Sequence, residues 1–108
     1  MAEQHQIDRL FATILERRGA DPADSYTAKL LHRGPPRIAK KLGEEAVEVA
    51  LAAVGESKQA VVGESADLLY HLLVLWAARK IDPEDVWKEL AERVGTSGHD
   101  EKKVRGET

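Results

Sequence analysis

The sequence predicts an all-α fold, in which an antiparallel helical bundle is completed by homodimerisation. Apolar residues recur at helical spacing along most of the chain, and no segment shows the strict alternation that marks a strand. Only five of the 108 residues are aromatic, so the core must be built from Leu, Val, Ile and Ala, a mixture that favours helices. We expect a single domain over residues 1–95, followed by a polar C-terminal tail over 96–108.

The first two expected helices occupy the N-terminal third of the chain. A helix from about residue 3 to 18, ended by Gly19, is predicted from apolar residues at i, i+3, i+4 and i+7 spacing. A short helix over 26–31 follows, with Asp24 or Ser25 as its N-cap. The apolar residues of the first helix are Ile7, Leu10, Phe11, Ile14 and Leu15.

Two long helices are expected next, joined by a tight turn. Gly34 closes the short helix, and Pro35-Pro36, which cannot lie inside a helix, opens the first long one. Gly55 suits the C′ position of this helix, and Ser57 suits the N-cap of the following helix over about 58–80. These signals predict a helical hairpin that turns near Glu56.

The second helix of this hairpin is apolar on nearly every side between residues 68 and 78. A helix that is hydrophobic all round is buried all round, and three helices in so short a chain can hardly cover it. We therefore expect a homodimer with a shared core. A last helix should open with Asp82 as N-cap and Pro83 at its first position, and end at Gly95.

Two acidic groups lie inside these apolar helices. At about 100° per residue, Glu45 and Glu48 share one helix face, and Glu64 and Asp67 repeat their spacing on the next helix. The midpoints of the two pairs average to position 56, so an antiparallel hairpin places the pairs at the same height. Four carboxylates without a cation would repel one another. We therefore expect a divalent metal, and Mg²⁺ suits carboxylates combined with substrate phosphates.

Basic residues precede and begin the acidic helix. These side chains can hold phosphate oxygens while the metal polarises the phosphorus. The basic residues are Lys29, Arg33, Arg37, Lys40 and Lys41. Glu44 could orient or deprotonate the attacking water. A less specific interpretation is that the acidic residues form a solvated helix face. Lys40 and Lys41 would then pair with Glu44 and Glu45 at i,i+4 spacing. His71 is expected to be a hydrogen-bonded core residue rather than a metal ligand.

The composition restricts the partners of the chain. A net charge of −3 gives no global attraction to nucleic acid or to an anionic membrane. The absence of cysteine excludes disulfides and thiolate metal sites. The N-terminus lacks the features of a signal peptide, and the longest apolar run is too short to span a bilayer. We expect a cytoplasmic protein without a nucleic-acid or membrane partner.

The acidic groups resemble those of the all-α nucleoside-triphosphate pyrophosphohydrolases, which carry a Glu-Glu-x-x-Glu group and a later Glu-x-x-Asp group on adjacent helices. Within that superfamily, the chain resembles the phosphoribosyl-ATP pyrophosphohydrolase family over residues 7–102. Three further stretches carry this narrower resemblance: Ser25-Tyr26-Thr27-Ala28-Lys29-Leu30-Leu31, Ile38-Ala39-Lys40-Lys41-Leu42-Gly43-Glu44-Glu45 and Ser97-Gly98-His99-Asp100-Glu101-Lys102.

The resemblance implies that Mg²⁺ is bound by four carboxylates, those of Glu45, Glu48, Glu64 and Asp67. It places Glu44 in the site beside Glu45 and substrate recognition in the region from Tyr26 to Arg37. The implied reaction is hydrolysis of phosphoribosyl-ATP to phosphoribosyl-AMP and pyrophosphate, the second step of histidine biosynthesis. The resemblance also implies a homodimer. Many family members are fused to a zinc-dependent cyclohydrolase, and the short, cysteine-free chain is expected to be a stand-alone enzyme.

Two alternatives remain open at this point. A house-cleaning pyrophosphohydrolase for non-standard nucleoside triphosphates would share the metal site and differ in the region from Tyr26 to Arg37 and in the tail. A non-enzymatic helical dimerisation module would carry its acids merely on the surface. In that module, replacing Glu45 or Glu64 by glutamine would leave function and the response to magnesium unchanged.

Overall fold

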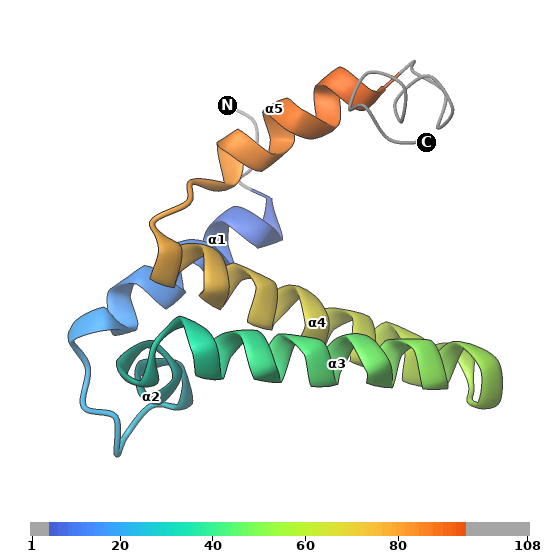
Figure 1. Cartoon of the computed structure of the whole chain (residues 1–108), viewed down its shortest axis with the longest axis horizontal. Helices are drawn as coiled ribbons and strands as arrows, with labels where there is room; N and C mark the ends of the chain where they lie inside the picture. Colours follow the sequence, from blue (N-terminus) through green and yellow to red (C-terminus); the bar gives the residue numbers. More distant parts are fainter. Residues whose placement is uncertain (1–4, 95–108) are drawn as a thin grey trace.

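The computed structural model describes residues 5–94, and within this range the chain is all-α, as predicted. The C-terminal stretch that resembles the family's tail therefore lies outside the described residues. Five α-helices and one 3-10 turn follow one another (Figure 1): α1 (Gln6–Glu16), η1 (Arg17–Gly19), α2 (Tyr26–Arg33), α3 (Pro35–Gly55), α4 (Lys58–Arg79) and α5 (Pro83–Arg93).

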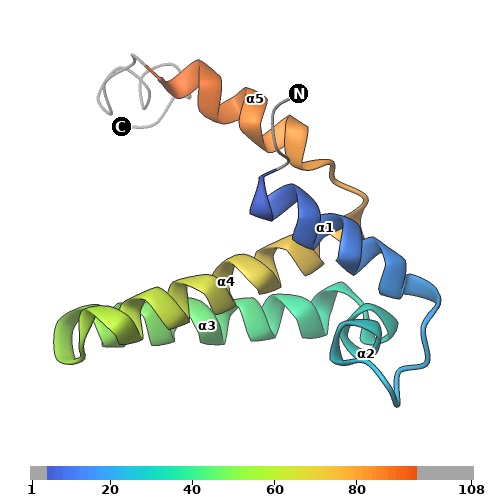
Figure 2. The same ribbon diagram turned by 180° about the vertical axis from the view of Figure 1, so that it is seen from behind.

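The antiparallel hairpin of α3 and α4 is the centre of the fold (Figures 1 and 2). Ser57 begins α4 as predicted, because its side chain accepts a hydrogen bond from the Ala60 N–H (3.2 Å). The predicted C′ role of Gly55 is wrong. Gly55 is the last residue of α3, and the chain turns at Glu56, whose extended backbone (φ −130°) needs no left-handed glycine.

The ends of the shorter helices follow from their caps. The helix expected from residue 3 begins only at Gln6, because His5 is extended and its Nδ1 accepts from the Ile7 N–H (3.1 Å). It also ends earlier than expected, since η1 takes over after Glu16. Of the two candidate caps for α2, Ser25 is the one used. Asp82 caps α5 as predicted.

Gly34 is the only residue between α2 and α3. Its backbone (φ +85°, ψ 178°) is a conformation that essentially only glycine adopts. It therefore closes α2, as predicted, and also opens α3, with Pro35 in the first helical turn. This single residue sets the angle between the two helices.

The hydrophobic core lies where α1 and α2 pack across the base of the hairpin, against the beginning of α3 and the second half of α4 (Figure 2). Trp76 of α4 meets the edge-on ring of Trp87 of α5, with centroids 5.9 Å apart. The buried side chains of this core are Ile14, Leu30, Ile38, Leu73, Val74, Trp76 and Ala77.

The second half of α4 is covered only in part within the chain, so the expected homodimer with a shared core stays a prediction. The helices α1, α2 and α3 bury five residues of this half, whereas Leu72 and Leu75 are half-buried and Leu69 is 45% exposed. The larger uncovered surface belongs to α3. We call it the α3 apolar face, and it consists of exposed residues on the outer side of that helix: Ala46, Val47, Ala50, Leu51, Ala53 and Val54.

By length and mean hydropathy alone, α4 could cross a bilayer. Core helices of globular proteins pass the same test. Three helices pack against α4, and its first half carries Glu64 and Asp67, side chains that are costly in hydrocarbon. We therefore interpret α4 as the central helix of a globular domain.

Candidate active site

Three glutamates gather between α3 and α4. Glu45 and Glu48 lie one turn apart on α3, and Glu64 faces them from α4, so that one carboxylate oxygen of each lies within 4.8 Å of the others. This confirms, for these three residues, that the acidic pairs lie level across the hairpin. We call this group the acidic cluster. The side chains are held in place by the helical backbone and by the turn at Glu56–Ser57.

Two oxygens of the acidic cluster are buried without a partner. The Oε2 atoms of Glu45 and Glu64 are inaccessible to solvent and accept no hydrogen bond, while Glu48 is exposed. An unsatisfied buried carboxylate oxygen is costly. Such an arrangement indicates a site that is completed by a cation or a donor from outside the chain.

The electrostatics of the cluster agree with this interpretation. Burial, and then the neighbouring Glu48 carboxylate, raise the pKa of Glu45 above its ordinary value. The close Glu48 carboxylate and then burial raise the pKa of Glu64. The carboxyl groups of Glu45 and Glu64 therefore hold their protons more tightly than an isolated glutamate does, because their neighbours carry like charge. A bound divalent cation would reverse this effect by favouring the charged forms.

Asp67, the fourth expected ligand, lies beside the acidic cluster rather than within it. Its side chain is exposed, and it is not among the carboxylates that approach one another within 4.8 Å. Its charge still contributes to the raised pKa values of Glu45 and Glu64. Asp67 therefore lies near the acidic cluster without being part of it.

Glu44 points away from the acidic cluster and pairs with Lys41. The Lys41 Nζ donates to Glu44 Oε2 at 3.1 Å, which is an i,i+3 pair and replaces the i,i+4 pair expected with Glu45. The Lys41 ammonium lowers the pKa of Glu44, and the hydrogen bond to Glu44 raises the pKa of Lys41. Glu44 is thus a charged carboxylate at the edge of the site.

A cationic pocket of about 130 Å³ lies between α2 and the beginning of α3. It is lined by Tyr26, Lys29, Leu30, Arg33, Arg37 and Lys41. Four of the basic residues that the sequence indicated for phosphate binding thus meet in one place, together with Tyr26. Lys40 does not line this pocket, because it lies about 100° around the helix from Lys41. Its charge acts instead on Glu44.

Aromatic and polar side chains join α2 to α4 beside the acidic cluster. The Thr27 and Tyr70 hydroxyls share a short hydrogen bond, and the Tyr26 ring stacks on the Tyr70 ring. His71 is buried, and its Nδ1 lies 2.8 Å from the carbonyl oxygen of Asp67, as expected for a hydrogen-bonded core residue. Its Nε2 faces the Tyr26 hydroxyl at 3.4 Å. Sequence reasoning missed this contact, which joins residues 45 positions apart.

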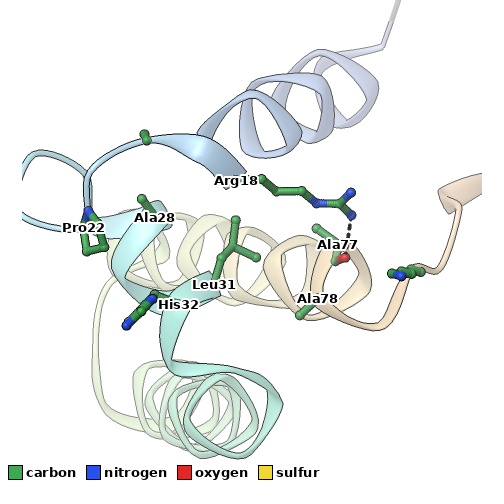
Figure 3. A pocket seen from close by; sticks show the side chains of 9 residues that line it. Arg18, Pro22, Ala28, Leu31, His32, Ala77 and Ala78 are labelled. Carbon is green, nitrogen blue, oxygen red and sulfur yellow. Dashed lines mark hydrogen bonds between the residues drawn. The ribbon is translucent and has the colours of Figure 1, made fainter.

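A larger cavity, of about 400 Å³, lies elsewhere, at the C-terminal end of α4 (Figure 3). Arg18 reaches across it and donates to the Ala77 carbonyl at 2.8 Å. Its lining includes His32, Leu31 and Ala78 but none of the acidic residues. Ala78 and Glu64 are 14 residues apart on α4, which corresponds to about 20 Å along the helix. The smaller cationic pocket is therefore the candidate for the active site, because Lys41 in its lining pairs with Glu44 of the acidic helix.

An α-helical hairpin with two facing acidic groups, next to a cationic pocket, defines the class of the protein as an all-α pyrophosphohydrolase. Sequence comparison specifies the family. The sequence model of phosphoribosyl-ATP pyrophosphohydrolase matches residues 7–94. The chain belongs to this family.

Relatives that are named phosphoribosyl-ATP pyrophosphatase resemble the chain over almost its whole length. The protein from Azospirillum brasilense is 59% identical over 99 residues, which cover 92% of this chain and 89% of the relative. The protein from Paramagnetospirillum magneticum is 58% identical over 106 residues, or 97% of each chain. The protein from Rhodospirillum rubrum is 61% identical over 99 residues, covering 92% of this chain and 85% of the relative.

Proposed function

We propose that the protein hydrolyses phosphoribosyl-ATP to phosphoribosyl-AMP and pyrophosphate in a magnesium-dependent reaction, as the second step of histidine biosynthesis. The observation that carries this proposal is the acidic cluster, with two buried oxygens that have no partner, beside a cationic pocket. Membership of the family and the names of the close relatives support the choice of substrate.

The donor set of the acidic cluster fits Mg²⁺. This cation takes hard oxygen ligands, commonly one or two carboxylates together with substrate phosphates. Glu45, Glu48 and Glu64 would hold it, and Asp67 would complete the set from its place beside them. When bound, the ion supplies charge stabilisation to the phosphate oxygens and lowers the pKa of a coordinated water.

The cationic pocket binds the phosphate chain of the substrate in this proposal. Arg33 and Arg37 offer planar, bidentate donors to phosphate oxygens, and Lys29 adds a third positive charge. Lys41 lines the same pocket, and its pKa is raised first by its hydrogen bond to Glu44 and also by the charge of Glu45, so Lys41 marks the side of the pocket that is nearest to the acidic cluster. Phosphates held here lie with one end toward the acidic cluster. Lys40 belongs to the wider basic surroundings in this proposal.

Hydrolysis forms a bond between a water oxygen and a phosphorus atom and breaks the bond to the oxygen that bridges the α and β phosphates. Glu44 orients or deprotonates the attacking water, because it is the carboxylate of the α3 motif that stays outside the three-glutamate group. It must exchange its contact with Lys41 for a contact with water, while Lys41 turns to the substrate phosphates. Glu45 acts on the reacting atoms from within the acidic cluster.

We also propose that the protein acts as a homodimer through the α3 apolar face. Val54 is 86% exposed and Leu51 is 59% exposed, on a helix side that carries only small or apolar residues between positions 46 and 54. The radius of gyration is 16.2 Å, whereas a compact chain of 100 residues measures about 13 Å. Both observations support a second copy packed along the hairpin.

The cellular setting follows from the substrate. Phosphoribosyl-ATP is a highly charged, water-soluble metabolite, so we propose that the enzyme acts in the cytoplasm. The net charge of −3 offers nucleic acid and anionic membranes no general attraction.

The decisive experiment measures pyrophosphate release from phosphoribosyl-ATP, with and without Mg²⁺, beside a panel of standard and damaged nucleoside triphosphates. We expect magnesium-dependent turnover that is confined to phosphoribosyl-ATP. Turnover across the panel would instead establish a house-cleaning enzyme. Failure to turn over any substrate, with Glu45→Gln and Glu64→Gln indistinguishable from the unmodified protein, would leave only the dimerisation module.

A further inference from the structure

We propose that His71 is a positioning residue that holds Tyr26 at the boundary between the cationic pocket and the acidic cluster, so that the Tyr26 ring forms a fixed wall of the pocket beside the substrate's phosphate chain. The inference rests on the proposed function for its substrate. It assigns a role to a buried histidine that the metal site and the phosphate pocket do not themselves use. Its basis is a chain of contacts that runs from α4 to α2.

The orientation of the His71 ring is fixed by the backbone. A carbonyl oxygen can only accept, so the 2.8 Å contact with the Asp67 carbonyl requires the proton on Nδ1. In the neutral ring, Nε2 is then the acceptor, and it faces the Tyr26 hydroxyl. His71 as a whole is only 6% exposed, so water does not compete freely for this nitrogen. Outer partners of this kind orient the groups that touch metals and substrates.

Tyr26 occupies the position where such orientation matters. Its side chain is 51% exposed and lines the cationic pocket, and its aromatic ring packs against both Tyr70 and His71. The contact of its hydroxyl with His71 is long, at 3.4 Å. Such contacts in enzymes without substrate often shorten when the substrate binds. The ring packing holds Tyr26 in place in the meantime.

His71 also lies next to the acidic residues. It follows Asp67 by one helical turn on α4, and its Nδ1 donates to the backbone carbonyl of that residue. The His71 side chain thus connects the backbone of Asp67 on α4 with Tyr26, the first residue of α2, the helix that supplies four of the six residues lining the cationic pocket. Thr27 and Tyr70 form a second hydrogen-bonded connection between the same helices, and neither residue lines the cationic pocket or belongs to the acidic cluster.

The matched variants follow from this geometry. Tyr26→Phe removes the hydroxyl and keeps the ring. His71→Asn keeps a donor at the position of Nδ1 and loses the group at Nε2, whereas His71→Gln places an amide near the position of Nε2. Tyr70→Phe is the control, because it breaks the connection to Thr27 and preserves the stacking on Tyr26. His71→Leu replaces His71→Asn if that variant does not fold.

Two readouts are needed: KM and kcat for phosphoribosyl-ATP at saturating Mg²⁺, and calorimetric binding of inorganic pyrophosphate with Mg²⁺. We expect Tyr26→Phe and His71→Asn each to raise KM and to weaken pyrophosphate binding by about 10-fold or more. The double variant should be no worse than either single one, because both remove the same contact. His71→Gln should recover most of the loss. Tyr70→Phe should lower Tm without changing KM.

Losses that multiply in the double variant would overturn the proposal, because independent residues behave in that way. A His71→Asn variant with a lower Tm but unchanged KM and pyrophosphate binding would overturn it as well, by showing a purely structural role. If the unmodified protein does not turn over phosphoribosyl-ATP, the proposed function fails. The pyrophosphate measurements alone then decide the role of His71.

Discussion

Replacement of Leu51 by alanine is the sharpest test of the dimer proposal. Leu51 lies in the middle of the α3 apolar face and is 59% exposed in the single chain. The change removes roughly three methyl or methylene groups, each worth about 0.8 kcal/mol when it is buried. Because alanine is the best helix former, α3 itself should be unharmed.

The expected effect can be worked out from this exposure. A dimer buries at most the exposed part of the side chain, so the loss is about 1.4 kcal/mol for each copy. In a two-fold interface the same residue is replaced on both sides. The total of about 2.8 kcal/mol corresponds to a roughly 100-fold weaker dimer.

Sedimentation equilibrium over a concentration series measures this dissociation constant directly. Leu10→Ala on α1 is the control, because Leu10 is 37% exposed but lies outside the α3 apolar face. We expect the control to leave the constant unchanged. A monomeric unmodified protein at micromolar concentration, or equal constants for Leu51→Ala and the unmodified chain, would refute the reasoning.

Three further predictions concern the site and the backbone. In metal-free buffer the pKa values of Glu45 and Glu64 are raised from 4.5, so the unfolding free energy should fall as pH rises through these raised values. Glu45→Gln or Glu64→Gln should make the unfolding free energy depend less on pH, raise the metal-free Tm at pH 7 and abolish turnover. Denaturant titrations from pH 4 to 8 measure the pH dependence, and an equal dependence in the variants and the unmodified protein would contradict the role of these two carboxyls. Arg37→Gln should raise KM for phosphoribosyl-ATP by about 10-fold and weaken its salt dependence, while Arg9→Gln on α1 should not; saturation curves at two ionic strengths decide. Gly34→Ala should lower the free energy of unfolding by about 1–3 kcal/mol, because Gly34 has a backbone conformation that alanine rarely adopts. Gly63→Ala has open space around the new methyl group and should stabilise α4 by up to about 1 kcal/mol. Thermal unfolding of both variants measures these opposite effects.

Features that depend on local sequence could be predicted well. The helices, the caps at Ser57 and Asp82 and the level placement of the acidic residues require only helical spacing and the position of one turn. The failure at Gly55 is also local, because an extended residue at Glu56 turns the chain equally well. Lys40 could have been separated from Lys41 by the same spacing argument, since Arg37 and Lys41 are one turn apart and Lys40 is not in phase with them.

Features that depend on the docking of distant helices could not be predicted. The contact between Tyr26 and His71 exists only because α2 packs against α4, and neither residue carries a local signal for the other. The same docking decides which apolar surface remains uncovered. Helices α1 and α2 cover part of the second half of α4, and the larger exposed apolar surface lies on α3. Periodicity shows that a face is apolar but not which neighbour covers it.

The single residue between α2 and α3 limits how this chain can vary in length. The cationic pocket takes Tyr26, Lys29 and Arg33 from one helix and Arg37 and Lys41 from the other. One residue inserted at Gly34 would turn the two sets by about 100° relative to each other and disperse the charges. Insertions and deletions between homologues should therefore accumulate in the connection over residues 20–25 and be absent at Gly34. Engineered loops or affinity tags belong in the same connection.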